Sequence, residues 1–318
     1  MTATAVTSDH SKGLTLTFIG AMVITFDTPV LRLIDGPQWT VMFWRASLLC
    51  LAVLTWWLVM TMIKKNPPPL VNGKAGLIII LLYATGNITF ITAVFNTTIA
   101  NVVFILALTP LFAAVISFLW FREMLRIETW LALAMSLLGV AIIVWSGLHS
   151  GSILGDLMAA ATALTMAIAF TITRRTGKDM SMSPILVGAI TASIAFFVSD
   201  AFLPDSFAIG PLAVSSLFNG SYNLNVLALE PHQWGWMFLN GAIIMPLSYS
   251  LLALGPRYIT AAEVALFLLL ETALAPIWVW LVVDEKVPLA TIFGGTIILA
   301  TLMVHSLYKL RRTNPKTI

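Results

Sequence analysis

Four ionisable side chains lie inside long apolar runs of this 318-residue chain: Asp27, Arg45, Glu263 and Glu271. An acidic or basic side chain at the centre of a lipid bilayer costs roughly 2.5–3.5 kcal/mol on insertion scales. Several such residues are tolerated only if they pair with one another or face a water-filled cavity. In such a cavity they would bind a charged solute or carry a proton, which is the chemistry that these residue types indicate.

Asp27 and Arg45 are spaced to meet across a helical hairpin. Asp27 lies about eight residues before the turn at Gly36, and Arg45 lies about nine residues after it. On antiparallel helices that rise 1.5 Å per residue, both residues lie at a depth of roughly 10–13 Å from that turn. The spacing predicts a buried ion pair between the first two spans, which either fixes helix packing or serves in gating or substrate contact. Pro29 follows closely and has no N–H, so it predicts either a plain kink or a helix broken near a transport site.

Glu263 and Glu271 lie eight residues apart on the predicted ninth span. That spacing turns the side chain by about 80° and raises it by about 12 Å, so both could line one path. For Glu263, near the predicted inner end, the structural alternative is a pair with Arg257 or a place at the interface. Glu271 is near the midplane, where a low dielectric disfavours its charged form. It is predicted to couple protons or to balance a cationic substrate; the alternative is a permanently protonated group that hydrogen-bonds a neighbouring helix.

A second set of candidate binding residues is neutral. They come from the predicted third, fourth and eighth spans: Tyr83, Asn87, Asn101, Asn240 and Tyr249. A small-molecule pocket is mostly apolar and aromatic with a few polar groups, which these residues could supply. The alternative is structural, because amides commonly hydrogen-bond across membrane helices and hold them together.

Composition places these residues in a membrane. The chain is 59% hydrophobic and 10% charged, whereas a typical soluble domain has about 25% charged residues, and the mean hydropathy is +0.96. These values exclude a disordered chain, a coiled coil, a nucleic-acid-binding module and most soluble enzymes. The single cysteine, Cys50, lies in an apolar run. That excludes a disulfide framework and a thiol metal site.

The apolar runs predict ten membrane-spanning helices, since a span needs roughly 20 apolar residues. They cover about 14–34, 39–63, 75–95, 98–121, 127–146, 153–173, 184–203, 233–254, 258–282 and 287–308. No removable signal peptide is recognised before the first span. The longest connection, 204–232, contains no Lys or Arg.

The Lys and Arg residues predict the orientation, because cytoplasmic loops carry an excess of both. With the N-terminus inside, 14 of the 17 basic residues fall on inner segments, and the 204–232 loop lies outside. We therefore expect an integral protein of the bacterial cytoplasmic (inner) membrane with its N- and C-termini in the cytoplasm.

The chain also repeats itself. The segment from Ile99 to Glu123 resembles the segment from Ala261 to Glu285 at an offset of 162. Each copy is an apolar helix that contains a proline, ends in Glu and is followed by another apolar span. We predict two five-helix repeats, 1–147 and 148–318, and because five is odd the second must enter the membrane from the opposite side. Inverted repeats of this kind are typical of transporters whose binding site lies near the midplane.

The order and spacing of these features resemble the EamA branch of the drug/metabolite transporters over nearly the whole chain. The motifs are the Thr109–Ala114 run, Phe43-Trp44-Arg45 before Leu48, Gly155-Asp156-Leu157 leading to Arg174-Arg175, and the two Glu ends. The resemblance implies an all-α, ten-helix carrier that exports or exchanges small organic solutes. It also implies a cavity built largely by the first, third, fourth, sixth, eighth and ninth spans. This chain departs from the family by carrying Asp27, Glu263 and Glu271 where members commonly have apolar or hydroxyl residues.

These observations favour a secondary transporter of an amino-acid-like, cationic or zwitterionic metabolite that works by alternating access. Nothing resembles an ATP-binding motif, and protons are the candidate coupling ion at Glu271. The expected partners are a small-molecule substrate and the lipid bilayer, without nucleic acid, cofactor or metal, in a monomer or a homodimer. Two other classes remain open: a non-transporting sensor or scaffold on a transporter fold, and an intramembrane enzyme. The enzyme is disfavoured because all four His residues lie at termini or span ends and no nucleophile has a plausible base.

Overall fold

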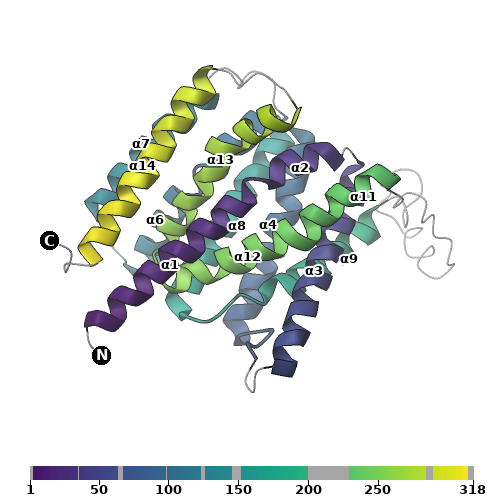
Figure 1. The fold of residues 1–318 in the computed structure, drawn as a ribbon, viewed down its shortest axis with the longest axis horizontal. Coiled ribbons are helices and arrows are strands. Elements are labelled where there is room, and N and C mark those ends of the chain that lie inside the picture. Colours follow the sequence, from purple (N-terminus) through teal and green to yellow (C-terminus); the bar gives the residue numbers. More distant parts are fainter. Residues whose placement is uncertain are drawn as a thin grey trace.

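The computed structural model describes residues 3–34, 36–63, 67–97, 99–122, 126–144, 152–199, 229–283 and 289–313. Within these ranges every regular element is a helix (Figure 1). Most of the predicted 204–232 loop lies outside the described residues, as do Lys64, Lys65, Glu123, Glu285, Lys286 and Lys316.

The helices fall where the apolar runs predict them. Those of the first half are α1 (Ala3–Ile24), α2 (Asp27–Ile34), α3 (Gln38–Ile63), α4 (Gly73–Asn96), α5 (Ile99–Leu106), α6 (Thr109–Phe121) and α7 (Ile127–Val144). Those of the second half are α8 (Ile153–Thr176), α9 (Ser183–Val198), α11 (Pro231–Phe238), the π-helix η2 (Leu239–Ile244), α12 (Met245–Leu254), the 3-10 turn η3 (Gly255–Arg257), α13 (Ala261–Val283) and α14 (Leu289–Thr313). The main difference is at the start, where the polar residues before the predicted first span continue α1 back to Ala3.

Length and hydropathy make a membrane the natural environment of this bundle. Five described helical segments are long and apolar enough to cross a bilayer: His10–Leu31, Gln38–Ile63, Gly73–Asn96, Ile153–Thr176 and Pro231–Arg257. Shorter apolar helices accompany them, and large apolar side chains such as Met62, Phe293 and Val304 are exposed on the outside. A soluble monomer rarely exposes such contiguous apolar surface, whereas a lipid-facing helix requires it.

Prolines break the predicted first and fourth spans. Pro29 cannot bond the carbonyl of Thr25, and α1 ends at Ile24, just before that residue. Pro110 likewise cannot bond the carbonyl of Leu106, and α5 ends at that residue. The eighth span instead widens into η2 before Pro246, with the N–H of Met245 bonded to the carbonyl of Asn240. A local π-bulge of this kind re-satisfies backbone groups that a proline would otherwise leave without a partner.

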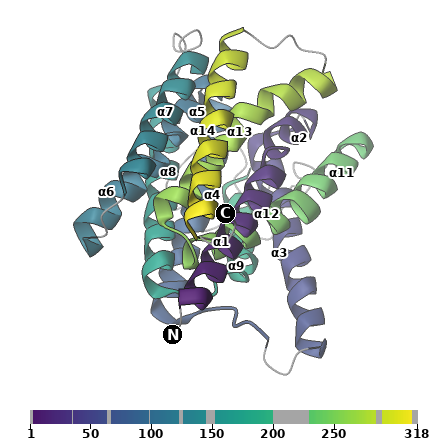
Figure 2. The same ribbon diagram turned by 60° about the vertical axis from the view of Figure 1, so that its left-hand side comes forward.

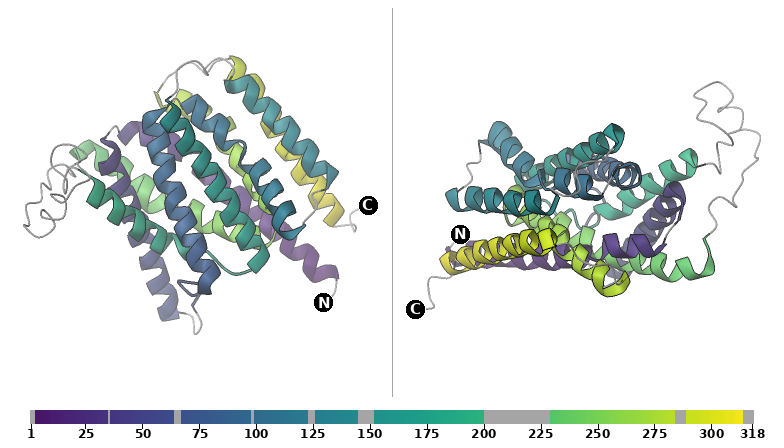
Figure 3. Two further views of the ribbon diagram at one scale, coloured as in Figure 1. Left: turned by 180° about the vertical axis from the view of Figure 1, so that it is seen from behind. Right: turned by 90° about the horizontal axis from the view of Figure 1, so that it is seen from above.

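Helices from the two halves of the sequence pack side by side. The main pairs are α4 with α8, α3 with α9, α7 with α14, α1 with α12, and α6 with both α8 and α13. Figures 1 and 2 show α7 alongside α14, and the view from behind in Figure 3 shows α4 alongside α8. A Cβ on Gly139 would lie 2.7 Å from the carbonyl oxygen of Gly294, so glycine permits the close approach of α7 and α14.

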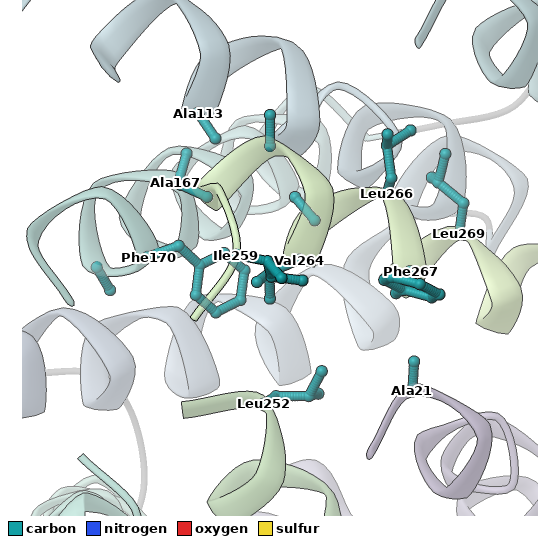
Figure 4. Packing of buried hydrophobic residues seen from close by; sticks show 14 of the residues in the cluster. Ala21, Ala113, Ala167, Phe170, Leu252, Ile259, Val264, Leu266, Phe267 and Leu269 are labelled. Carbon is teal, nitrogen blue, oxygen red and sulfur yellow. The ribbon is translucent and has the colours of Figure 1, made fainter. Parts of the chain in front are cut away.

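The largest cluster of buried apolar side chains surrounds α13 (Figure 4). Phe267 of this helix lies on the side of Ala21 of α1 and Leu252 of α12, whereas Leu266 and Leu269 point to the other side of the helix. Side chains of α6 and α8 also belong to the cluster, together with others from α4, α7, α9 and α14. Because α13 is enclosed on several sides, polar groups on its middle turns must find partners among neighbouring helices or face a cavity.

Candidate functional site

A cavity of about 550 Å³ lies between helices from both halves of the chain. This size is within the range of small-molecule sites. Its polar lining residues are Asp27, Thr28, Thr109, Thr162, Tyr249, Glu271 and Thr272. Phe90 and Phe95 of α4 contribute aromatic walls, and Gly36 lines the cavity near the end of α2. The cavity therefore reaches from the middle of α13 toward the end of the bundle where α2 and α4 end.

Asp27 is the first residue of α2 and the centre of a buried polar cluster. Its Oδ2 lies 2.6 Å from Arg45 Nη2, and both side chains are 2% exposed. Asn240 of η2 donates from Nδ2 to Asp27 Oδ1 over 2.7 Å. The predicted ion pair is present, and it recruits Asn240 as a third member. Both carboxylate oxygens thus have a donor, which is the condition for a buried charge to be tolerated.

Arg45 also contacts groups next to the cavity. Its Nη2 donates to Met245 Sδ at 2.9 Å, and its Cζ lies 6.0 Å from the ring centroid of Phe90, which lines the cavity. Nε and Nη1 of Arg45 have no acceptor among the described residues. Asp27, Arg45 and Phe90 therefore form one side of the site, with the net charge of the ion pair close to zero.

Glu271 lies on the middle turns of α13 and lines the same cavity. Its side chain is partly exposed to the cavity, and its Oε1 accepts a hydrogen bond from Thr28 Oγ1 over 2.9 Å. Among the side chains that the structure describes, no Lys or Arg forms an ion pair with it. Glu271 is therefore the cavity carboxylate whose charge, when present, is not balanced by any described Lys or Arg side chain.

Two further contacts join the break after α1 to α13. Trp278 Nε1 donates to Thr25 Oγ1 over 2.9 Å, and the Trp278 ring stacks on Phe26 with centroids 4.5 Å apart and planes at 27°. Together with the bond from Thr28 to Glu271, they bring Thr25, Phe26 and Thr28 against one helix. Asp27 belongs to the same segment and is bound by Arg45 of α3 and Asn240 of η2. The position of the segment therefore depends on these helices as well as on α13.

Glu263 does not line this cavity. It is the third residue of α13, and its Oε2 accepts hydrogen bonds from both the backbone N–H and the hydroxyl of Thr260, each over 2.9 Å. The N–H of Glu263 donates back to Thr260 Oγ1 over 3.3 Å. This reciprocal arrangement is a capping box. Arg257, the predicted alternative partner, instead lies 3.7 Å from Asp179.

The other neutral candidates are not gathered in one site. Tyr249 lines the main cavity, and Tyr83 lines a smaller neighbouring one. Asn101 donates to Asp156 Oδ1 over 3.2 Å, an interhelical bond between α5 and α8 of the kind expected for a structural amide. Asn87 is buried on α4 at 3% exposure and lines neither cavity.

Sequence reasoning overlooked the hydroxyl groups of the site. Thr28 and Thr109 each precede a proline, and each lines the cavity at the start of a broken helix. The Thr-Pro pairs in the sequence carried that signal, because a proline frees backbone near it and a neighbouring threonine becomes accessible there. Nothing in the sequence indicated that Thr28 would contact Glu271, 243 residues away. The described residues contain no group of three His, Cys, Asp or Glu that could hold a metal ion.

Comparisons with known proteins agree with this fold. Residues 11–145 match the model of the EamA-like transporter family, which confirms the resemblance over that part of the chain. Among solved structures 28 chains match, and one, a crystal structure of a protein, superposes with a TM-score of 0.73 at 12% identity over 94% of this chain and 99% of that chain. At that identity the likeness concerns the fold alone. The curated proteins compared contain no match to this sequence.

Proposed function

We propose that this chain, whose residues 11–145 match the EamA-like transporter family, is a secondary transporter of a small amino-acid-like metabolite that is cationic or zwitterionic. The observation that carries the proposal is the cavity of about 550 Å³ with Glu271 in its wall, where no described Lys or Arg side chain pairs with that carboxylate. Asp27 is already balanced by Arg45, so the cavity has an excess of one carboxylate when Glu271 is charged. An amine or another organic cation would supply the missing charge.

The aromatic walls support the same class of substrate. Phe90 and Tyr249 both line the cavity, and the face of an aromatic ring attracts a cation through its quadrupole. Hydroxyl groups of Thr109, Thr162 and Thr272 offer neutral hydrogen-bonding partners for the rest of the solute. This combination of apolar walls and a few polar groups is typical of small-molecule sites.

We further propose that 1–147 and 148–318 form two inverted five-span repeats within a ten-span protein. The helix pairs support this arrangement, because they are the pairs that a two-fold axis in the membrane plane would generate. Such an axis exchanges the pair α4–α8 with the pair α12–α1, and it maps the pairs α3–α9, α7–α14 and α6–α13 onto themselves. α1 also begins on the side of the bundle where α14 ends (Figure 1), as an even number of spans requires.

The mechanism proposed is alternating access by rocking of the two repeats around the cavity. With both termini in the cytoplasm of a bacterial cell, the ends of α2 and α4 lie on the outer side, so the cavity extends outward from Glu271. Glu271 is the proposed proton-coupling group, because a solute cation and a proton can each neutralise it but cannot both occupy it. Such competition drives export or exchange without ATP.

Solute flux tests the proposal directly. Purified protein is screened with a metabolite panel by thermal shift, and each stabilising compound is then followed across proteoliposomes with and without a pH gradient. We expect an amine-bearing compound to be bound and transported. A stabilising compound that is bound but not moved would contradict transport and favour a sensor or scaffold. Recovery of that compound in chemically altered form would contradict it in favour of an enzyme.

A further inference from the structure

The main cavity ends at a layer of four side chains. Ile24, Met166, Tyr249 and Leu268 line both the main cavity and a smaller cavity of about 30 Å³. They come from α1, α8, α12 and α13, so the layer joins four helices. The smaller cavity is also lined by Ser183 at the start of α9. This layer therefore separates the main cavity from the end of the bundle where α9 begins.

Ile24 is the last residue of α1, and the break in the first span follows it directly. The hydroxyl of Thr25 donates to the carbonyl of Met22 over 2.7 Å and accepts from Trp278 Nε1 over 2.9 Å. One side chain thus closes the last turn of α1 and ties that turn to α13. The ring of Phe26 stacks on Trp278 and adds apolar contact at the same point.

The same segment reaches the proposed substrate-binding carboxylate. Thr28, four residues after Ile24, donates to Glu271 Oε1 over 2.9 Å. A cation bound at Glu271 competes with Thr28 for that oxygen and releases the start of α2. Thr25 lies between Ile24 and Thr28 in the sequence. Its contact with Trp278 therefore decides whether that release also moves Ile24.

We infer that Thr25 and Trp278 are positioning residues that hold Ile24 in the layer between the two cavities and couple that layer to Glu271. Without the bond, the last turn of α1 keeps its internal hydrogen bond to Met22 but loses its fixed distance from α13. Ile24 then leaves the layer more often, and the smaller cavity opens to the main one. The coupling to transport rests on the proposed function, whereas the positioning of Ile24 does not.

Cysteine labelling measures the opening of the layer without any substrate. Cys50 is the single cysteine, so Cys50→Ala gives a background in which Ser183→Cys is the only thiol. Ser183 is 3% exposed and lines the smaller cavity, and its labelling by a hydrophilic maleimide in nanodiscs reports how often that cavity opens. We expect Trp278→Phe, which removes only the bond to Thr25, to raise the labelling rate about two- to tenfold, as loss of one net hydrogen bond predicts. Thr25→Val also removes the hydroxyl bond to Met22 and is expected to raise the labelling rate at least as much.

Matched variants separate positioning from general loosening. Thr25→Ser keeps the hydroxyl and is expected to label at the wild-type rate, as is Trp56→Phe, which alters an exposed Trp on α3. A second reporter, Ala195→Cys, occupies a fully buried position farther along α9 and is expected to stay unlabelled in every variant. Unchanged labelling of Ser183→Cys in both Thr25→Val and Trp278→Phe would overturn the inference. So would an equal rise at Ala195→Cys, since it would show loosening of the whole bundle.

The two proposals fail in different ways. If proteoliposomes of the unmodified protein move no solute while Thr25→Val still opens the smaller cavity, the proposed function fails and the positioning role stands. If solute moves but labelling is unchanged, the positioning role fails alone. Where both hold, Thr25→Val is expected to change the maximal flux several-fold while the solute affinity, set at Glu271, stays within about twofold.

Discussion

Arg45 Nη2 lies 2.6 Å from Asp27 Oδ2 in a part of the bundle where each side chain is 2% exposed. The two residues belong to α3 and α2 on either side of the first turn, and Asn240 contributes from the other half of the chain. An ion pair with both partners so deeply buried contributes less to stability than its geometry suggests, because desolvation offsets much of the attraction. Removing one partner is therefore expected to destabilise the protein more than removing both.

The asymmetry gives the first prediction. Asp27→Asn alone leaves Arg45 charged and buried without a counter-ion, so we expect a loss of about 3–5 kcal/mol in the free energy of unfolding. The double variant Asp27→Asn with Arg45→Gln removes both charges and is expected to recover most of that loss. Thermal or denaturant unfolding in the same detergent compares the stability of the unmodified protein, the single variant and the double variant. A double variant no more stable than the single one would contradict this account of the pair.

The second prediction concerns the coupling carboxylate. Glu271→Gln keeps the shape of the side chain and an oxygen that can accept from Thr28, but it cannot bind or release a proton. We expect the protein to fold, and its flux to lose dependence on pH. Glu263→Gln on the same helix is the matched control, because glutamine also completes a capping box and Glu263 does not line the cavity. Retained pH dependence in Glu271→Gln would rule out Glu271 as the coupling group.

The third prediction concerns the aromatic wall. Phe90→Leu keeps an apolar surface against Arg45 but removes the ring face from the cavity. The affinity for a cationic solute is expected to fall about two- to fivefold, the range for a partly exposed cation–π contact. Phe197→Leu, an exposed position on α9, is expected to leave affinity unchanged. Binding of the solute identified by thermal shift measures both, and equal affinities of the two variants would speak against a role for the ring.

The fourth prediction concerns helix packing. A Cβ on Gly188 would lie 2.6 Å from the carbonyl oxygen of Ala46, so Gly188→Ala must push α9 away from α3. We expect a loss of about 1–3 kcal/mol in stability, as for other overpacked contacts. Gly235→Ala in α11 meets nothing within 4 Å and is expected to be neutral or slightly stabilising, because alanine is the better helix former. Equal melting temperatures for the two variants would argue against this close approach.

The positions of the helices could be predicted from the sequence because a bilayer imposes a length and an apolar composition on every segment that crosses it. The depth of Asp27 and Arg45 was predictable for a similar reason, since rise per residue converts sequence distance from a turn into height. Pro29, whose ring allows no bond to the carbonyl of Thr25, predicted either a kink or a break in the first span, and the structure has the break. Each of these features depends only on neighbours along the chain.

Partners that come from distant parts of the chain were not predictable in this way. Height along a helix is determined by sequence distance, but the direction of a side chain around the helix and the identity of the facing helix are not. The sequence therefore placed Glu263 and Glu271 on one path, whereas the start of α13 at Ala261 makes Glu263 part of a cap. Only packing between the two halves brought Thr28 to Glu271 and Trp278 to Thr25, because those contacts join residues 243 and 253 positions apart.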